Sequence, residues 1–179
     1  MGLVLLVGGA RSGKSALAVR LASEQGAPVD FLATAQAGDE EMEARIAQHE
    51  RERPDSWRTI EEPLRLREAI EEVDGAHCLI VDCLTLWTAN ALERLGAEEA
   101  EARAVRAADA ASVRPGPTIA VTNEVGLGLV PDSPLARSYR DLLGRVNAIW
   151  AAAADRALLL VAGRALDLER ADSLAGGLW

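Results

Sequence analysis

Lysine, phenylalanine, tyrosine, histidine and cysteine are all scarce in this chain of 179 residues. Lys14 is the only lysine beside eighteen arginines, and phenylalanine and tyrosine occur once each. The core must therefore be mainly aliphatic, and a hydrophobic content of 49% is enough for a single folded domain over residues 1–179. The net charge of −9 repels the phosphodiester backbone, so we expect no general binding of nucleic acid.

Cysteine occurs only as Cys78 and Cys83, whose spacing matches no zinc pattern and which would supply too few ligands. We expect two buried, reduced thiols. Long apolar runs are absent as well, since none approaches the ~20 residues that span a bilayer. The apolar N-terminus lacks a basic leader and runs straight into a glycine-rich loop, so we expect a cytoplasmic protein with no membrane partner.

The single lysine lies in Gly8-Gly9-Ala10-Arg11-Ser12-Gly13-Lys14-Ser15, which has the Gly-x4-Gly-Lys-Ser spacing of a phosphate-binding loop. An apolar run of strand length, residues 3–7, precedes it, and a helical pattern over residues 15–22 follows. This order aims backbone N–H groups and a helix N-terminus at an anion. We expect the loop to bind nucleotide phosphates, with Lys14 at the outer phosphates and the Ser15 hydroxyl helping to hold Mg²⁺. The alternative is a glycine-rich turn that binds nothing.

Strand-like and helical segments alternate along the rest of the chain. The strands are expected at residues 29–34, 77–82, 118–123 and 156–162, and the helices at residues 39–53, 64–73, 84–95, 98–112 and 135–154. This alternation predicts an α/β fold with a mainly parallel sheet and helices on both faces. Residues 57–60 are a candidate edge strand.

Ligands of parallel sheets bind beyond the carboxyl ends of the strands, so the residues that follow each strand should converge on one crevice. Asp82 closes an apolar strand and is a candidate ligand of Mg²⁺, although it is also placed to cap the next helix. Glu124 is a second acidic candidate for the metal or the substrate. Gly126 and Gly128 indicate a loop whose backbone a ligand can approach.

The two histidines differ in their surroundings. His77 begins a strand without polar neighbours in sequence, so we interpret it as structural or surface-exposed. His49 shares one face of the predicted helix 39–53 with Met42, Arg45, Ile46 and Arg53. Two guanidiniums beside an imidazole suit a phosphate, and an imidazole can attack phosphorus. From the residues alone, a surface histidine in a salt-bridged helix is the simpler interpretation.

In combination, these motifs resemble the bifunctional adenosylcobinamide kinase / adenosylcobinamide-phosphate guanylyltransferase family of cobalamin biosynthesis. The matching segments follow the family's order from residue 8 to about residue 147: Gly8–Ser15, Ala33–Ala35, Asp39–Met42 with Arg45, Ile46 and His49, Trp57–Pro63, Val81–Thr85, Thr122–Gly126 with Gly128, Val130 and Pro131, then Ala136–Arg137, Arg140–Asp141 and Gly144–Asn147. The resemblance implies a phosphate-loop (P-loop) NTPase-type, RecA-like fold. It also implies a homotrimer with the histidine helix near a subunit boundary.

The resemblance implies that the protein catalyses two reactions in the same region. A nucleoside triphosphate, ATP or GTP, phosphorylates the aminopropanol arm of the corrinoid adenosylcobinamide. GMP then moves from GTP to that phosphate through a histidine–GMP intermediate, giving adenosylcobinamide-GDP and pyrophosphate. By motif position the histidine is His49, Lys14 assists the chemistry, and Ser15 and Asp82 hold Mg²⁺. Nucleotide contacts are implied for Gly8, Gly9, Ala10, Arg11, Ser12, Gly13, Lys14, Ser15, Ala33, Thr34, Ala35, Glu50, Arg51, Glu52, Arg53, Glu61 and Asp82.

The chain departs from the family pattern at Ala148, where the family commonly has glutamine, and from Glu169 onward no match is recognisable. A phosphate-loop kinase for another small alcohol is the main alternative. A GTP-dependent switch is excluded, because its Asn-Lys-x-Asp guanine reader needs a second lysine. A RecA-like ATPase acting on DNA fits poorly with an acidic surface and no basic stripe.

Overall fold

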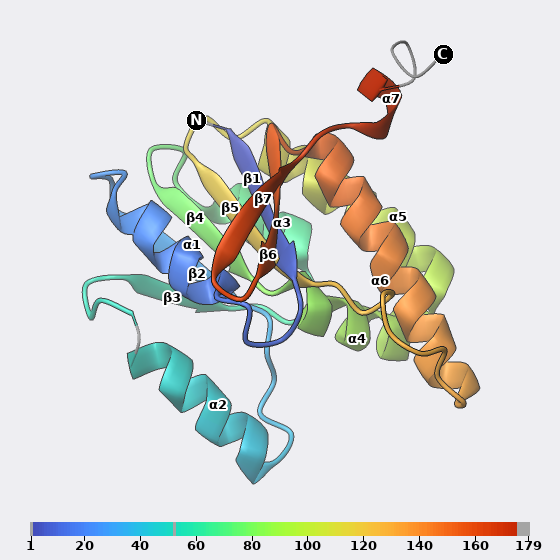
Figure 1. The fold of residues 1–179 in the computed structure, drawn as a ribbon. Coiled ribbons are helices and arrows are strands. Elements are labelled where there is room, and N and C mark those ends of the chain that lie inside the picture. Colours follow the sequence, from blue (N-terminus) through green and yellow to red (C-terminus); the bar gives the residue numbers. More distant parts are fainter. Residues whose placement is uncertain (1, 52, 175–179) are drawn as a thin grey trace.

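Figure 1 shows the fold as a computed structural model, which describes residues 2–51 and 53–174. Seven strands form one sheet in the order β3-β2-β4-β5-β1-β6-β7. All neighbouring strands run parallel except β6 and β7, which are antiparallel. The strands are β1 (Leu3–Gly8), β2 (Val29–Ala33), β3 (Arg58–Glu61), β4 (Cys78–Asp82), β5 (Thr118–Asn123), β6 (Arg156–Val161) and β7 (Arg164–Leu168).

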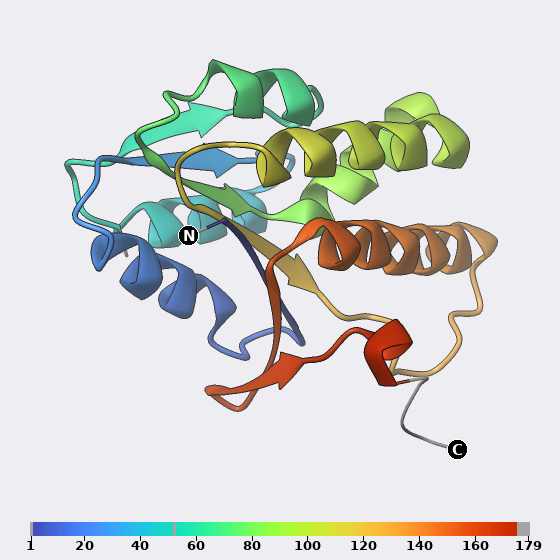
Figure 2. The same cartoon turned by 90° about the horizontal axis from the view of Figure 1, so that it is seen from above.

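Helices cover both faces of this sheet, as the alternating pattern predicts. They are α1 (Lys14–Ser23), α2 (Glu40–Arg51), α3 (Leu66–Glu72), α4 (Leu84–Leu95), α5 (Ala97–Ser112), α6 (Pro134–Ala153) and α7 (Ala171–Leu174). Helices α3 to α6 pack on one face and α1 on the other, which is clearest in Figure 2. Among the described residues, no helix is both long and apolar enough to cross a membrane.

Two aliphatic clusters form the core, one on each face of the sheet. In β1, Leu3 and Leu5 pack toward α3–α6, whereas Leu6 packs toward α1. This alternation explains why the central strands are apolar without a polar break, since both of their faces are buried. Two tryptophans, Trp87 and Trp150, lie fully buried among the aliphatic side chains.

The C-terminal hairpin is the element that sequence reasoning missed. The expected strand over residues 156–162 is β6, but the chain then turns back as β7, a strand that was not expected from sequence. Ala162 and Gly163 both have positive φ, 51° and 74°, as a tight hairpin turn requires. The sequence did not predict this turn, because Ala162 occupies a position at which such turns favour Asn, Asp or Gly.

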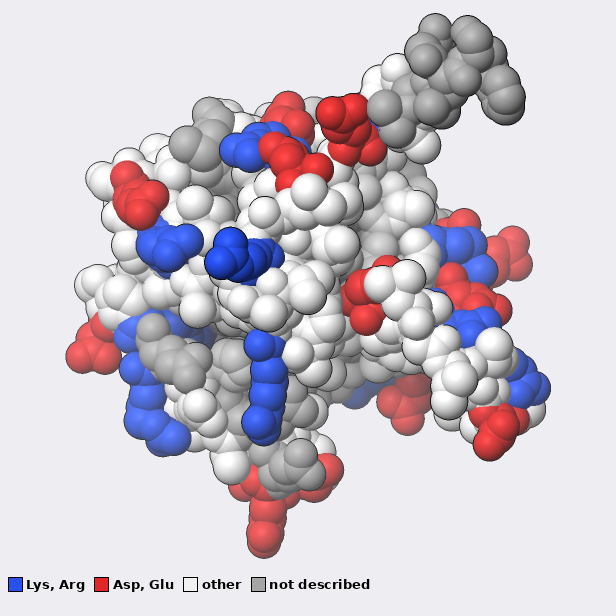
Figure 3. Space-filling model, viewed as in Figure 1, with Lys and Arg blue, Asp and Glu red and all other residues white. Residues whose placement is uncertain are grey.

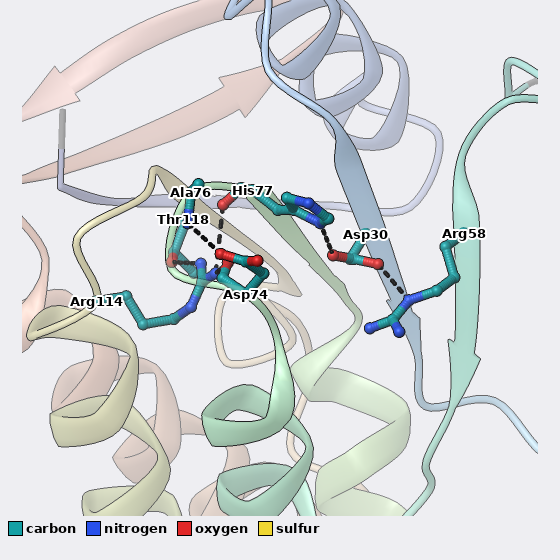
Figure 4. A network of polar contacts seen from close by, with 7 residues as sticks. All are labelled: Asp30, Arg58, Asp74, Ala76, His77, Arg114 and Thr118. Atoms are coloured by element: carbon teal, nitrogen blue, oxygen red, sulfur yellow. Dashed lines mark hydrogen bonds and ion pairs between the residues drawn. The ribbon is translucent and has the colours of Figure 1, made fainter.

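A buried carboxylate joins β2 to β3 and to the residue that precedes β4. It lies at the amino ends of these strands, whereas the phosphate loop follows the carboxyl end of β1. Asp30 in β2 is only 1% exposed, and it accepts hydrogen bonds from Arg58 Nε at 2.5 Å and from His77 Nδ1 at 2.7 Å. Figure 4 shows both donors directed at this carboxylate. His77 therefore has a structural role, in agreement with the sequence interpretation, although its partner lies 47 positions away.

Replacing Asp30 with alanine should lower the free energy of unfolding by about 2 kcal/mol, because two charge-assisted hydrogen bonds are lost at a buried site. Arg58 and His77 retain access to solvent, which limits the cost. Urea or thermal denaturation measures the change. The matched control is Asp167→Ala, which removes a surface ion pair to Arg156 and should cost less than about 1 kcal/mol. Equal effects of the two substitutions would contradict this role for Asp30.

Candidate functional site

The phosphate loop joins the end of β1 to the start of α1, and Lys14 is held inside it. The Lys14 ammonium donates to the backbone oxygens of Gly8 and Gly9 at 3.0 and 2.7 Å, and it is 7% exposed. Burial lowers the pKa of Lys14, while the nearby Asp82 carboxylate acts in the opposite direction. A single cation therefore lies at the centre of a ring of main-chain groups, as a phosphate site requires.

Two glycines of the loop are required by its geometry. Gly13 has φ 99°, which other residues rarely adopt. A Cβ on Gly8 would collide with the backbone oxygen of Leu160 in β6. The turn between β6 and β7 supports the loop from the same side, because Gly163 N–H donates to the Ser12 oxygen at 3.0 Å.

A cavity of about 300 Å³ lies beside this loop. Residues from α1, β2, β4 and the histidine helix line it: Ser15, Ala16, Val19, Phe31, His49, Arg53 and Asp82. The lining is mixed, with polar groups from Ser15, His49 and Asp82 and apolar ones from Val19 and Phe31. Four residues expected from sequence to serve nucleotide chemistry therefore face one space, although they come from three separate segments.

Asp82 lies at the carboxyl end of β4 and faces the cations of the site. Burial raises the pKa of its carboxyl group, and His49, a hydrogen bond from Ser15, Lys14 and Arg53 all oppose that rise. The alternative interpretation of Asp82 as a helix cap is wrong. Helix α4 begins at Leu84, its N-cap is Cys83, and no side chain caps it.

Arg53 connects the histidine helix to the sheet. Its guanidinium stacks on the Phe31 ring, 3.9 Å from the centroid, and its Nε donates to the His49 oxygen at 3.0 Å. These contacts position His49 in the cavity even though α2 ends at Arg51. Acidic side chains gather at the N-terminal end of α2 and basic ones at its C-terminal end (Figure 3). The side chain of Arg45, expected on the same face, and the whole of Glu52 lie outside the described residues.

The remaining expected contact residues lie along the same edge of the sheet. Ala33 is in register with Asp82 on one side and Glu61 on the other. Thr34 is fully buried, and its hydroxyl donates to the Cys83 oxygen at 2.7 Å and accepts from the Cys83 N–H at 3.0 Å. The Thr34 side chain thus ties the end of β2 to the end of β4, and Glu50 and Arg51 are exposed in the last turn of α2.

Several positioning residues were not identified as such from sequence. Asn90 on α4 donates to the oxygens of Thr34 and Pro63 at 2.9 and 3.2 Å, which joins the segments that follow β2 and β3. Thr85 accepts from the Asn123 N–H at 2.7 Å, and Asn147 donates to the Asn123 oxygen at 3.0 Å. Their partners are backbone groups tens of positions away, so no local pattern reveals them.

Both cysteines are free, in agreement with the expectation of reduced thiols, but only Cys78 is buried and Cys83 is partly exposed, so the expected burial is wrong for Cys83. Burial raises the pKa of Cys78 to about 11 and that of Cys83 to about 12. Thiols with such values are poor nucleophiles and poor metal ligands near neutral pH.

A family model described as "Cobinamide kinase / cobinamide phosphate guanyltransferase" matches residues 4–168. The chain belongs to this family. It is therefore a bifunctional enzyme of adenosylcobalamin biosynthesis, with kinase and guanylyltransferase activities. This family membership excludes the alternative of a kinase for another small alcohol without guanylyl transfer.

Curated relatives cover nearly the whole chain. The bifunctional adenosylcobalamin biosynthesis protein CobP of Pseudomonas aeruginosa is 45% identical over 166 residues, which is 92% of this chain and 96% of that protein. The corresponding CobU proteins are 42% identical in Salmonella typhimurium and 38% identical in Escherichia coli K12, each over 90% of this chain and 96% of the relative.

Solved structures with little sequence identity share the family's fold. The RadB recombinase aligns with a TM-score of 0.50 at 17% identity, covering 88% of this chain and 73% of that one. An ATPase of a type III secretion system aligns with a TM-score of 0.53 at 13% identity, covering 89% and 52%. These likenesses establish the P-loop NTPase-type, RecA-like architecture and nothing further about the reaction.

Proposed function

We propose that this enzyme phosphorylates adenosylcobinamide with a nucleoside triphosphate and then transfers GMP from GTP to the product through a covalent bond to His49. The observation that carries the proposal is the shared cavity of about 300 Å³, in which His49 faces the same space as Ser15 and Asp82 of the nucleotide site. A nucleophile and a phosphate-binding loop that line one space are what nucleotidyl transfer requires.

The phosphate loop supplies binding and charge neutralisation in both reactions. The amides of residues 8–15 would surround the phosphate chain, and Lys14 would move its hydrogen bonds from the Gly8 and Gly9 oxygens to phosphate oxygens. In the kinase step the corrinoid hydroxyl oxygen attacks the γ-phosphorus. The bond from that phosphorus to the bridging oxygen breaks, the nucleoside diphosphate leaves with the electron pair, and the hydroxyl proton is released.

In the guanylyl transfer, a neutral His49 nitrogen attacks the α-phosphorus of GTP. A bond forms between nitrogen and phosphorus, and the bond to the β-phosphate oxygen breaks, so that pyrophosphate leaves with the electron pair. A phosphate oxygen of adenosylcobinamide phosphate then attacks the same phosphorus, the nitrogen–phosphorus bond breaks, and His49 leaves with the electron pair as neutral imidazole. Arg53 supports this role, because its stacking on Phe31 and its bond to the His49 oxygen hold the helix end in place.

The residues present also fit Mg²⁺. Ser15 and Asp82 both line the cavity, and the Ser15 hydroxyl acts on the Asp82 carboxyl to lower its pKa, so a hydroxyl and a carboxylate oxygen already lie close together there. Within residues 2–51 and 53–174, no three His, Cys, Asp or Glu side chains gather as a protein-only metal site. Mg²⁺ characteristically takes one or two protein ligands and completes its shell with phosphates and water. When bound to Ser15 and Asp82, it would offset negative charge on the phosphates.

A pulse–chase experiment tests the covalent route. The wild-type enzyme is incubated with GTP labelled at the α-phosphate, freed of nucleotide by rapid desalting, and mixed with adenosylcobinamide phosphate alone. We expect acid-labile label on the protein that passes to the corrinoid without further GTP. Enzyme that carries no label after desalting, yet forms adenosylcobinamide-GDP when GTP is present, would show direct transfer and overturn the proposal.

A further inference from the structure

We propose that the loop between β5 and α6, together with the first turn of α6 (residues 124–136, the β5–α6 loop), is the docking surface for the corrin macrocycle of the acceptor. This inference rests on the proposed function, because it assigns a place to the bulky part of the substrate of that site. A corrin is a large ring with hydrocarbon edges and faces, so an exposed aliphatic surface is its natural complement.

Aliphatic side chains on this loop are exposed to an unusual degree. Leu127 is 86% exposed, Leu129 96%, Val130 64% and Leu135 70%. Single exposed aliphatic residues are normal on a protein surface, whereas four exposed within nine positions concentrate apolar surface on one loop, as binding sites do.

The loop is held in shape by its polar groups, which leaves the aliphatic ones free to bind. The Glu124 carboxylate accepts from the Gly126 N–H. Arg137 donates to the oxygens of Pro131 and Asp132 at 2.9 and 2.6 Å, and the Ser133 hydroxyl accepts from Ala136 N–H at the start of α6. A surface fixed in advance loses less entropy when a rigid ring docks on it.

The position of the loop suits an acceptor that must reach the nucleotide. Glu124 N–H donates to the Gly8 oxygen at 3.1 Å, so the loop starts in direct contact with the phosphate loop. In Figures 1 and 2 it leaves the same edge of the sheet. The cavity of about 300 Å³ is at the small end for a nucleotide, so a macrocycle has to lie outside it.

Charge also favours this side of the site. An adenosylated cobalt(III) corrinoid with amide side chains carries a net positive charge. The loop contributes two carboxylates, Glu124 and Asp132, and no cation, since the nearest one, Arg137, follows it on α6. The C-terminal end of α2, on the other side of the phosphate loop, presents basic residues instead, which suits phosphates rather than a cationic ring.

The test compares the double variant Leu127→Ser/Leu129→Ser with the wild type. Both side chains are almost fully exposed, so the fold should be unaffected, which equal melting temperatures would verify. We expect the KM for adenosylcobinamide in the kinase reaction to rise about tenfold or more, with kcat at saturation retained. The dissociation constant of GTP and the self-labelling with GMP should not change, because neither involves the corrinoid.

Two controls make the outcome specific. Val113→Ser/Leu166→Ser removes two exposed aliphatic side chains elsewhere, 79% and 62% exposed, and should leave the KM unchanged. Free 1-amino-2-propanol is a poor acceptor that lacks the corrin ring. The loop variant and the wild type should therefore phosphorylate it at equal rates. An unchanged KM for adenosylcobinamide in a variant that still self-labels would overturn the docking surface and leave the covalent route intact. If light scattering showed that the loop variant had lost its assembly into oligomers, a second copy of the chain, and not the corrin, would cover the β5–α6 loop.

Discussion

Replacement of Lys14 by alanine is expected to lower the rates of both reactions by about a hundredfold to a thousandfold. The ammonium is the one buried cation inside the phosphate loop, and its hydrogen bonds to Gly8 and Gly9 hold it where negative charge develops on the phosphates. Removal of one such preorganised donor from a water-poor site costs rate on this scale. Since the kinase and the transferase steps share the loop, we expect a loss in both.

Steady-state assays of phosphocorrinoid formation from adenosylcobinamide and of pyrophosphate release from GTP measure the two effects separately. The matched control is Arg20→Ala, which removes an exposed cation two turns further along α1 and should leave both rates within about twofold of wild type. If Lys14→Ala impaired only one reaction, separate phosphate sites would serve the two steps. Lys14→Arg should not restore activity, because a planar guanidinium does not fit a loop shaped for a compact ammonium.

Replacement of His49 by alanine should abolish self-labelling with GMP and lower guanylyl transfer by about ten-thousandfold or more, because the nucleophile is gone. The kinase step needs no imidazole, since the corrinoid hydroxyl attacks the γ-phosphorus directly. We therefore expect kinase turnover to stay within about threefold of wild type. Separate assays of labelled protein, pyrophosphate and phosphocorrinoid report the three quantities.

The other histidine of the chain provides the control. His77→Gln alters the pair with Asp30 at the amino ends of the strands and should lower stability without removing the GMP label. Equal loss of kinase and transferase activity in His49→Ala would indicate that the imidazole binds nucleotide and forms no bond to it. Retained label in His49→Ala would place the covalent bond on another residue.

The sequence was sufficient to predict those features that depend on local pattern. Residues 3–22 contain a strand, a glycine-rich loop and a helix pattern in direct succession, so the local fold around Lys14 could be predicted. The order of apolar strands and amphipathic helices predicted the parallel sheet. The helix with His49 was also predictable, because a spacing of three and four places residues on one face.

Features that depend on contacts between distant positions could not be predicted. The role of Asn90 requires the oxygens of Thr34 and Pro63 to lie within its reach, which only the assembled sheet provides. The stacking of Arg53 on Phe31 likewise joins a residue after α2 to the middle of β2. Sequence reasoning assigned Arg53 to a phosphate, whereas its contacts also show it anchoring the histidine helix.

The C-terminal hairpin has a practical consequence for work with this enzyme. Its turn at Gly163 donates to Ser12, and β6 leaves no room for a side chain at Gly8. A chain that ends before residue 163 would keep the whole glycine-rich motif. It would still lose the hydrogen bond from Gly163 that supports the phosphate loop. Affinity tags, fusions and trimmed versions should therefore be joined beyond Leu168, where the last strand has ended.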